Sequence, residues 1–356
     1  MACITKRGGR YVIDCYDQTG KRYRKTMPEG TTKKAARERL GEIEKSINRG
    51  VFIHDKKVPI FSELTRQWLE HKKPNIRATT HEIDESIIKN HFGGFNALKV
   101  SMITTPMVEK FFSGLLTGGK KIGTIKRISS TLNQILAYAV RHRMIDSNPV
   151  RDAERPKKTM NSQRTVTVLN PEQIRALLDH TPNPETHALF MLAIMTGARQ
   201  GELLGLKWPD VDFEKKQLHV QRTYNHNRFF LPKTSGSIRK IDLAPAVILE
   251  LRKWKLASRP TELDLIFTQR NNKPLNGPSQ NEKLHNAVKK AGLPIIHFHE
   301  LRHTYASLLI SMGENIKYIQ TQLGHSTPMM TLNVYSHLMK SENQEAAVRL
   351  EKAIFG

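Results

Sequence analysis

The sequence is poor in cysteine and has no long apolar run. Two cysteines among 356 residues exclude a disulfide-stapled fold and suit a reducing cytoplasm. Residues 1–10 lack the apolar core of a signal peptide, and the longest apolar run, residues 188–195, is far too short to cross a bilayer. Internal repeats and low-complexity tracts are also missing. We therefore expect a cytoplasmic protein without membrane contact, in which residues 188–195 form a buried helix.

Positive charge is what the sequence has in excess. It holds 57 Lys and Arg against 33 Asp and Glu, which gives a formal net charge of +24. Such an excess does not determine a fold, but it favours an anionic partner, most often a nucleic acid. A ribosome-associated or merely basic soluble protein is the alternative at this level. The length of the chain suggests two or three domains.

Three segments differ in their patterns: 1–57, 58–164 and 165–356. The first is a small basic module with 15 Lys and Arg against 7 Asp and Glu. Its alternating stretches, separated by glycine-containing turns, predict three short strands and a following helix. The strands are expected at 3–5, 11–16 and 22–26, and the helix from Thr31 or Thr32 to about Arg49.

The second segment is expected to be helical and the third mixed. Apolar residues over 61–69 keep helical spacing, and a polar, proline-punctuated linker over 148–164 ends the second segment. In the third segment, Asn170 and Gln173 predict a capping box at the start of a helix. The expected fold class is therefore multidomain and mainly α with small β elements. Strands in the third segment are expected at 218–224, 229–231 and 238–243, with a turn at 234–236.

Four local patterns in the third segment carry guanidinium, ammonium, imidazole and phenol groups. Taken singly, each has an ordinary explanation, such as a solvated arginine, a lysine beside a turn or a core tyrosine. Their order and spacing are what give them weight. The patterns are Thr196-Gly197-Ala198-Arg199-Gln200-Gly201-Glu202-Leu203, then Lys233-Thr234, then His299-Glu300-Leu301-Arg302-His303, and finally Leu323-Gly324-His325, followed ten residues later by Tyr335.

This set resembles the active site of the tyrosine recombinase family, also known as the lambda integrase family. The family's order of Arg, Lys, His-x-x-Arg, His or Trp, and Tyr has a counterpart at every position. The resemblance implies an arm-type DNA-binding domain at 1–57, a helical core-binding (SAM-like) domain with linker at 58–164, and a mixed α+β catalytic domain at 165–356. The implied catalytic residues are Arg199, Lys233, His299, Arg302, His325 and the nucleophile Tyr335, with Glu202 and His303 in support.

The resemblance implies a site-specific DNA recombinase, an integrase of a phage or conjugative transposon. Such an enzyme cleaves and rejoins duplex DNA through a 3′-phosphotyrosyl intermediate, and so integrates and excises a mobile element. The implied partner is double-stranded DNA at core-type and arm-type sites, on which a homotetramer gathers paired sites. An excisionase and a host DNA-bending protein are candidate accessory partners, and the expected location is the nucleoid. No cofactor and no metal are expected.

The chemistry of the phosphate-binding residues agrees with this resemblance. Two guanidinium forks, those of Arg199 and Arg302, can hold the nonbridging oxygens of a phosphodiester without a metal. Glu202 lies three residues after Arg199 and can orient it. His299 and Arg302 have the same spacing, so both can point at one phosphate.

Tyr335 needs activation, because the reference pKa of a tyrosine is about 10. Nearby arginines favour the phenolate, and His299 could accept its proton. Lys233 is the expected general acid for the leaving 5′-oxygen. His325 is expected to donate a hydrogen bond to the phosphate. The ester stores the bond energy, so religation needs no ATP.

Other interpretations remain open. The stretch from His299 to His303 also matches H-E-x-x-H, in which both histidines would bind zinc and Glu300 would act as base. Arg302 would then place a fixed charge beside the metal, and no third ligand follows at a familiar spacing. A DNA-binding regulator without catalysis is disfavoured by the complete set. A type IB topoisomerase is disfavoured by the arm-like first module.

The end of the chain predicts one more helix, from Glu342 to Ile354 with Ser341 as its cap. A helix this short is marginal alone and must dock its apolar face somewhere. The family resemblance favours docking on a neighbouring protomer, and docking on its own domain is the alternative. The apolar face comprises Ala346, Ala347, Leu350, Ala353 and Ile354.

Overall fold

The computed structural model describes residues 2–50, 52, 54, 58–157, 167–231, 238–325, 327, 329 and 344–356. The chain divides into two units, Met1–Gln163 and Arg164–Gly356. Within the described ranges, no helix is long and apolar enough to cross a membrane.

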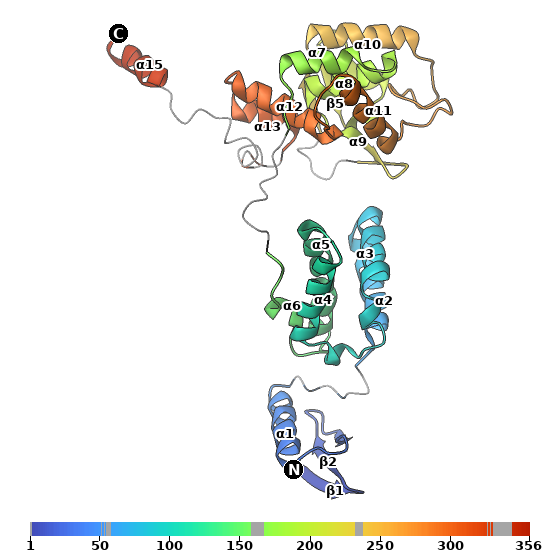
Figure 1. Cartoon of the computed structure of the whole chain (residues 1–356), viewed down its shortest axis with the longest axis vertical. Helices are drawn as coiled ribbons and strands as arrows, with labels where there is room; N and C mark the ends of the chain where they lie inside the picture. The colour runs from blue at the N-terminus through green and yellow to red at the C-terminus, as the bar shows by residue number, and fades with distance from the viewer. Residues whose placement is uncertain are drawn as a thin grey trace. The chain divides into compact units, whose positions relative to one another are not determined.

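A three-stranded antiparallel sheet and one helix form the N-terminal module (Figure 1). Strand alternation places Ile13, Cys15 and Tyr23 on one face, where they pack with Ile43 of the helix. The helix begins after Thr32, whose side chain caps it, so the predicted strands and helix are confirmed. The elements are β1 (Cys3–Arg7), β2 (Arg10–Tyr16), β3 (Arg22–Thr26) and α1 (Lys33–Asn48).

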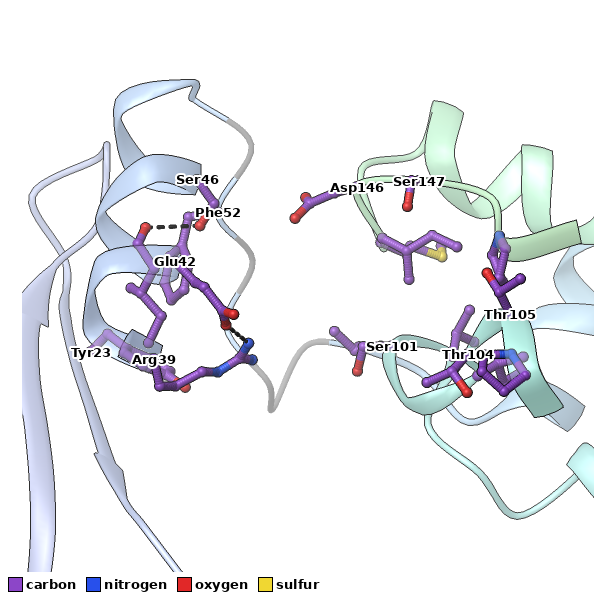
Figure 2. A pocket seen from close by; sticks show the side chains of 18 residues that line it. Tyr23, Arg39, Glu42, Ser46, Phe52, Ser101, Thr104, Thr105, Asp146 and Ser147 are labelled. Carbon is purple, nitrogen blue, oxygen red and sulfur yellow. Dashed lines mark hydrogen bonds and ion pairs between the residues drawn. The ribbon is translucent and has the colours of Figure 1, made fainter. Parts of the chain in front are cut away.

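Charged side chains cover the rest of this module. On the opposite face of the sheet, Asp14 accepts hydrogen bonds from Arg22 at 2.6 Å and from Arg24 at 2.9 Å. The hydrogen bond from Arg22, followed by that from Arg24, holds the pKa of Asp14 well below its usual range. On α1, Arg39 and Glu42 form an ion pair of 2.6 Å (Figure 2). The sheet therefore presents basic side chains on the face away from α1.

Residues 58–157 form the predicted helical part, with an apolar core of its own. Phe61, Leu64 and Trp68 are buried along one side of their helix, as their spacing predicts. One charge lies inside: Asp84 is fully buried and binds the Lys72 ammonium at 2.7 Å. The helices are α2 (Phe61–Lys72), α3 (Ala78–His91), α4 (Thr105–Thr117), α5 (Ile122–Arg141) and α6 (Pro149–Asp152), with short 3-10 turns η1 (Lys73–Asn75), η2 (Gly93–Phe95) and η3 (Val100–Met102).

The second unit is mainly helical around one large apolar core, which confirms the expected class. The run 188–195 lies in a largely buried helix, as predicted. The capping box of Asn170 and Gln173 is also confirmed. The helices are α7 (Pro171–Asp179), α8 (Pro184–Thr196), α9 (Gln200–Leu204), α10 (Pro245–Ala257), α11 (Gly277–Lys290), α12 (Phe298–Ser311), α13 (Ile316–Leu323) and α15 (Gln344–Phe355), with the turn η4 (Trp208–Asp210).

The strands of this unit differ from the prediction at one point. The single strand expected at 218–224 is wrong, because two strands in different sheets occupy it. Between them, the Gln221 amide donates to Asp210 at 2.6 Å and Arg222 forms an ion pair with Asp210, which turns the chain out of the first sheet. The strands expected at 229–231 and 238–243 are confirmed, and the turn at 234–236 lies outside the described residues. The sheets are β4 (Val211–Asp212), β5 (Gln217–Val220) and β8 (Arg239–Asp242) in the order β4-β5-β8, and β6 (Thr223–Asn225) with β7 (Arg228–Phe230).

Candidate active site

The junction of α8 and α9 places Arg199 at the edge of the core. Gly197 ends α8 in the left-handed region, at φ 59°. A Cβ atom at this position would lie 2.5 Å from Cδ1 of Tyr305 and 2.8 Å from Cδ2 of Leu323. The glycine therefore provides both the turn and the close approach of α12 and α13 to α8. Arg199 follows as the residue that caps α9.

Glu202 holds Arg199 through two contacts. Its Oε1 accepts from the Arg199 guanidinium at 2.8 Å, and its Oε2 accepts from the Arg199 backbone amide at 2.9 Å. The Glu202 side chain is 6% exposed, whereas that of Arg199 is 39% exposed. The predicted contact is therefore present, and the guanidinium remains within reach of a ligand.

Arg239, which the sequence analysis did not identify, lies on the other side of Glu202. Its side chain is 3% exposed, and its guanidinium donates to Glu202 Oε2 at 2.9 Å and to Oε1 at 3.2 Å. Burial alone would raise the pKa of Glu202, but the hydrogen bond and charge of Arg239, with those of Arg199, lower it below its ordinary value. The carboxylate therefore stays charged between two arginines. Strand alternation was a signal for this residue, because Arg239 shares the buried face of β8 with Ile241.

Arg302 on α12 is buried at 3% exposure and reaches two neighbouring elements. One terminal nitrogen donates to the carbonyl of Gly197 at 2.8 Å, and the other donates to the carbonyl of Leu323 at 2.8 Å. Arg302 thus bonds the turn at Gly197, which leads into Arg199. The structure therefore brings Arg302 and Arg199 to one place.

The C-terminal end of α13 is held by three arginines. Successive carbonyls of Gln322, Leu323 and Gly324 accept from Arg239 at 2.6 Å, from Arg302 at 2.8 Å and from Arg199 at 3.4 Å. The last carbonyls of a helix have no partner within the helix and carry its negative dipole end, so arginines are suitable partners. This end of α13 leads directly into His325.

His325 lies within this field of positive charge. Burial, followed by the charges of Arg302, Arg199 and Arg239, lowers the pKa of His325 to about 4. The imidazole is therefore neutral at pH 7, with one N–H donor and one acceptor nitrogen. The backbone amide of His325 donates to the carbonyl of Gln320 at 3.1 Å, and Gln320 donates through its side chain to the carbonyl of His325 at 2.9 Å.

His299 and His303 lie one turn apart on α12, with their rings edge to face at 4.8 Å between centroids. His299 is exposed, and its charge is among those that act on His325. Glu300 does not face the pair as a free base would, because its carboxylate accepts the backbone amide of His297 and caps α12. In the part of the chain that the structure describes, no group of three His, Cys, Asp or Glu residues could hold a metal ion.

Two expected site residues, Lys233 and Tyr335, lie outside the described residues. Two other tyrosines lie on the helices of the site, Tyr305 on α12 and Tyr318 on α13. Burial, followed by the charge of Tyr318, raises the pKa of Tyr305, and burial, followed by the charge of Asp242, raises the pKa of Tyr318. Tyr318 also lies 3.4 Å from a carboxylate oxygen of Asp242, to which it donates. Both are therefore poorly suited to attack as phenolates.

Comparison with known proteins gives matches over most of the chain. Residues 167–342 match the profile of the phage integrase family, and residues 61–155 match that of the phage integrase central domain. The chain is 30% identical to tyrosine recombinase XerC of Alcanivorax borkumensis, over 62% of this chain and 70% of that protein.

Two solved structures are similar in fold. The Tn1549 transposon integrase, in complex with a circular intermediate DNA, has a TM-score of 0.70 and 19% identity, over 83% of this chain and 99% of that one. The lambda integrase, as a tetramer bound to a Holliday junction, has a TM-score of 0.60 and 21% identity, over 91% of this chain and 96% of that one.

Proposed function

Because the chain belongs to the phage integrase family of tyrosine recombinases, we propose that Tyr335 is the nucleophile with which it cleaves DNA. The chain is a site-specific recombinase of the integrase type. The observation that carries the proposal is the cluster of Arg199 and Arg302 at the end of α13, twelve residues before Tyr335. The raised pKa values of Tyr305 and Tyr318 support the same choice.

The arginines bind the scissile phosphate in this proposal. Phosphoryl transfer passes through a state with extra negative charge on the nonbridging oxygens, and fixed guanidinium groups stabilise it. Arg199 is held by Glu202 yet remains 39% exposed, so it can approach DNA without losing its support. Two of the five N–H groups of Arg302 donate to backbone carbonyls, and these bonds fix the plane of the guanidinium. Neutral His325 adds a hydrogen bond through its N–H.

The remaining residues move protons. His299 accepts the proton of Tyr335 as the phenolic oxygen attacks phosphorus. The bond from phosphorus to the 5′-oxygen breaks, and Lys233 gives that oxygen its proton. The products are a 3′-phosphotyrosine and a 5′-hydroxyl end. Religation reverses these steps and regenerates the tyrosine. His303, in ring contact with His299, keeps that imidazole in place.

The proposal extends to the partners of the enzyme. We infer that residues 1–57 bind arm-type DNA through the basic sheet face, and that residues 58–164 and 165–356 together bind the core site. Four protomers then gather on paired sites, as in the lambda integrase tetramer on a Holliday junction. The exposed apolar side chains of α15, such as Leu350 and Ile354, support docking between protomers. The enzyme acts at the nucleoid, with an excisionase and a host DNA-bending protein to set direction.

A suicide substrate tests the nucleophile. A core site taken from the DNA that flanks the gene is nicked so that the short cleaved strand diffuses away. The unmodified protein should accumulate a covalent complex whose adduct maps to Tyr335. Tyr335→Phe should bind the same DNA normally and form no adduct, and Tyr318→Phe should behave as the unmodified protein. An adduct on Tyr305 or Tyr318 would contradict the assignment.

A further inference from the structure

We propose that Arg239 is a positioning residue for DNA cleavage, which holds Arg199 through Glu202 and the end of α13 through Gln322 at the same time. This inference rests on the proposed function of the site. Arg239 belongs to none of the motifs that the sequence analysis singled out. Its contacts connect Glu202, which lies 37 residues before it in the sequence, with Gln322, which lies 83 residues after it.

The first connection runs through Glu202. Each carboxylate oxygen of Glu202 accepts one donor from Arg199 and one from Arg239, at distances from 2.8 to 3.2 Å. The four donors fix the plane of the carboxylate, and that plane sets the direction of the Arg199 guanidinium. If Arg239 is removed, two donors are lost from a buried anion, and Glu202 can rotate toward Arg199 or away from it.

The second connection runs through α13. The Nε of Arg239 donates to the carbonyl of Gln322 at 2.6 Å. A Cβ atom at Gly324 would lie 3.0 Å from both Cδ and Nη1 of Arg239, so the glycine lets the guanidinium lie against the chain just before His325. Strand β8 makes a second bond to Gln322, because the Asp242 backbone amide donates to the Gln322 side chain at 3.1 Å. Arg239 therefore fixes where the segment that carries His325 begins.

Stability alone does not account for this arginine. The other buried residue of β8, Ile241, is apolar and fully buried. A buried ion pair costs desolvation energy that its attraction often fails to recover, so apolar residues in place of both Arg239 and Glu202 would serve the core at least as well. What an apolar residue could not do is hold a carboxylate and a carbonyl together in one plane. The geometry therefore points to the site as the reason for the charge.

The test uses the full-length protein, single-turnover cleavage of the nicked core site, and a matched control. Arg239→Met should slow cleavage by about 10- to 100-fold, the loss found for residues that orient the ligands of a metal centre, with little change in the affinity for DNA. Arg239→Lys keeps the charge but cannot make both connections, so its cleavage rate should fall between those of the unmodified protein and Arg239→Met. Arg222→Met is the control, because Arg222 forms a partly buried ion pair with Asp210 in the same unit, and it should cleave at nearly the normal rate.

A pH measurement tests whether the charge of Arg239 acts on His325 in the folded protein. The charge of Arg239 helps to keep the pKa of His325 at about 4, so Arg239→Met should raise the pKa of His325, read from its NMR titration, toward its ordinary value. Arg222→Met should leave the titration unchanged. In a double-mutant cycle, Glu202→Gln and Arg239→Met together should slow cleavage by less than the product of their separate effects.

Each outcome decides the matter. Normal cleavage by folded Arg239→Met overturns the inference, and so does equal slowing by Arg222→Met. If Arg239→Met fails to fold, Arg239→Lys decides: slowed cleavage with normal DNA affinity supports positioning, and a normal rate refutes it. Failure of the unmodified protein to form any covalent complex would instead refute the proposed function.

Discussion

Replacing Gly197 by alanine tests the geometry of the site at its tightest point. The residue has φ 59°, and the new Cβ would lie 2.5 Å from Tyr305 and 2.8 Å from Leu323. A residue with a Cβ in the left-handed region costs about 1–2 kcal/mol. Forcing a methyl group into a filled core costs about 1–3 kcal/mol more. We therefore expect Gly197→Ala to lower the free energy of unfolding of the second unit by about 2–5 kcal/mol.

Gly292 provides the matched control. It also lies in the left-handed region, at φ 67°, but no atom lies within 4 Å of the position of its Cβ. Gly292→Ala should therefore lose only the backbone part, about 1–2 kcal/mol. The entropy that alanine removes from the unfolded chain is common to both variants and cancels in the comparison.

Urea denaturation followed by tryptophan fluorescence measures the difference. The chain has three tryptophans, of which Trp68 lies in the first unit and Trp208 and Trp254 in the second. In a Trp68→Phe background the fluorescence reports the second unit alone. Equal destabilisation by the two alanines would refute the packing argument. Cleavage should also suffer more from Gly197→Ala, because the Gly197 carbonyl accepts from Arg302.

Three further predictions concern the whole enzyme. Arg302→Ala should slow single-turnover cleavage by about 10²–10³-fold with little loss of DNA affinity, and cleavage by the unmodified protein should persist in excess chelator; loss of activity in chelator, with zinc bound stoichiometrically, would revive the H-E-x-x-H interpretation. Deletion of residues 1–57 should spare core-site cleavage and abolish efficient integration, and DNA binding by the separate module should weaken with salt at a slope of about −0.9 per phosphate neutralised; no binding at low salt would contradict the arm-site assignment. Deletion of residues 341–356 should reduce cooperative assembly in gel-shift titrations and keep single-site binding, because Leu350 and Ile354 are exposed on α15; unchanged assembly, or unfolding of the truncated protein, would show that the tail packs on its own domain.

Local signals were sufficient to predict much of the fold. The capping box of Asn170 and Gln173 spans four residues, and the buried helix over 188–195 is apolar on all sides, so both are readable from short windows. The strand break between β5 and β6 is different in kind. It depends on Gln221 and Arg222 meeting Asp210, which lies 11 and 12 residues earlier. No pattern within the predicted strand carries that information.

The candidate site shows the same division. Arg199, Arg302 and His325 belong to short motifs with definite spacing, and the structure brings them together at the end of α13. Arg239 belongs to no such motif. Strand alternation could have marked it as buried, but its partner Glu202 is 37 residues away, and only the folded chain reveals the contact. A buried charge on an otherwise apolar strand face therefore predicts a partner of opposite charge elsewhere in the chain.

The anchoring of α13 also sets a limit on where Tyr335 can go. Ten residues separate Tyr335 from His325, and ten residues cannot span more than about 35 Å even when fully extended. One phenol confined to a sphere of that radius around the anchor corresponds to an effective concentration of at least about 10 mM. If Tyr335 is the nucleophile that we propose, it is thus supplied to the arginine cluster as a tethered reactant, whether the phosphate is held by its own protomer or by a neighbour within that reach.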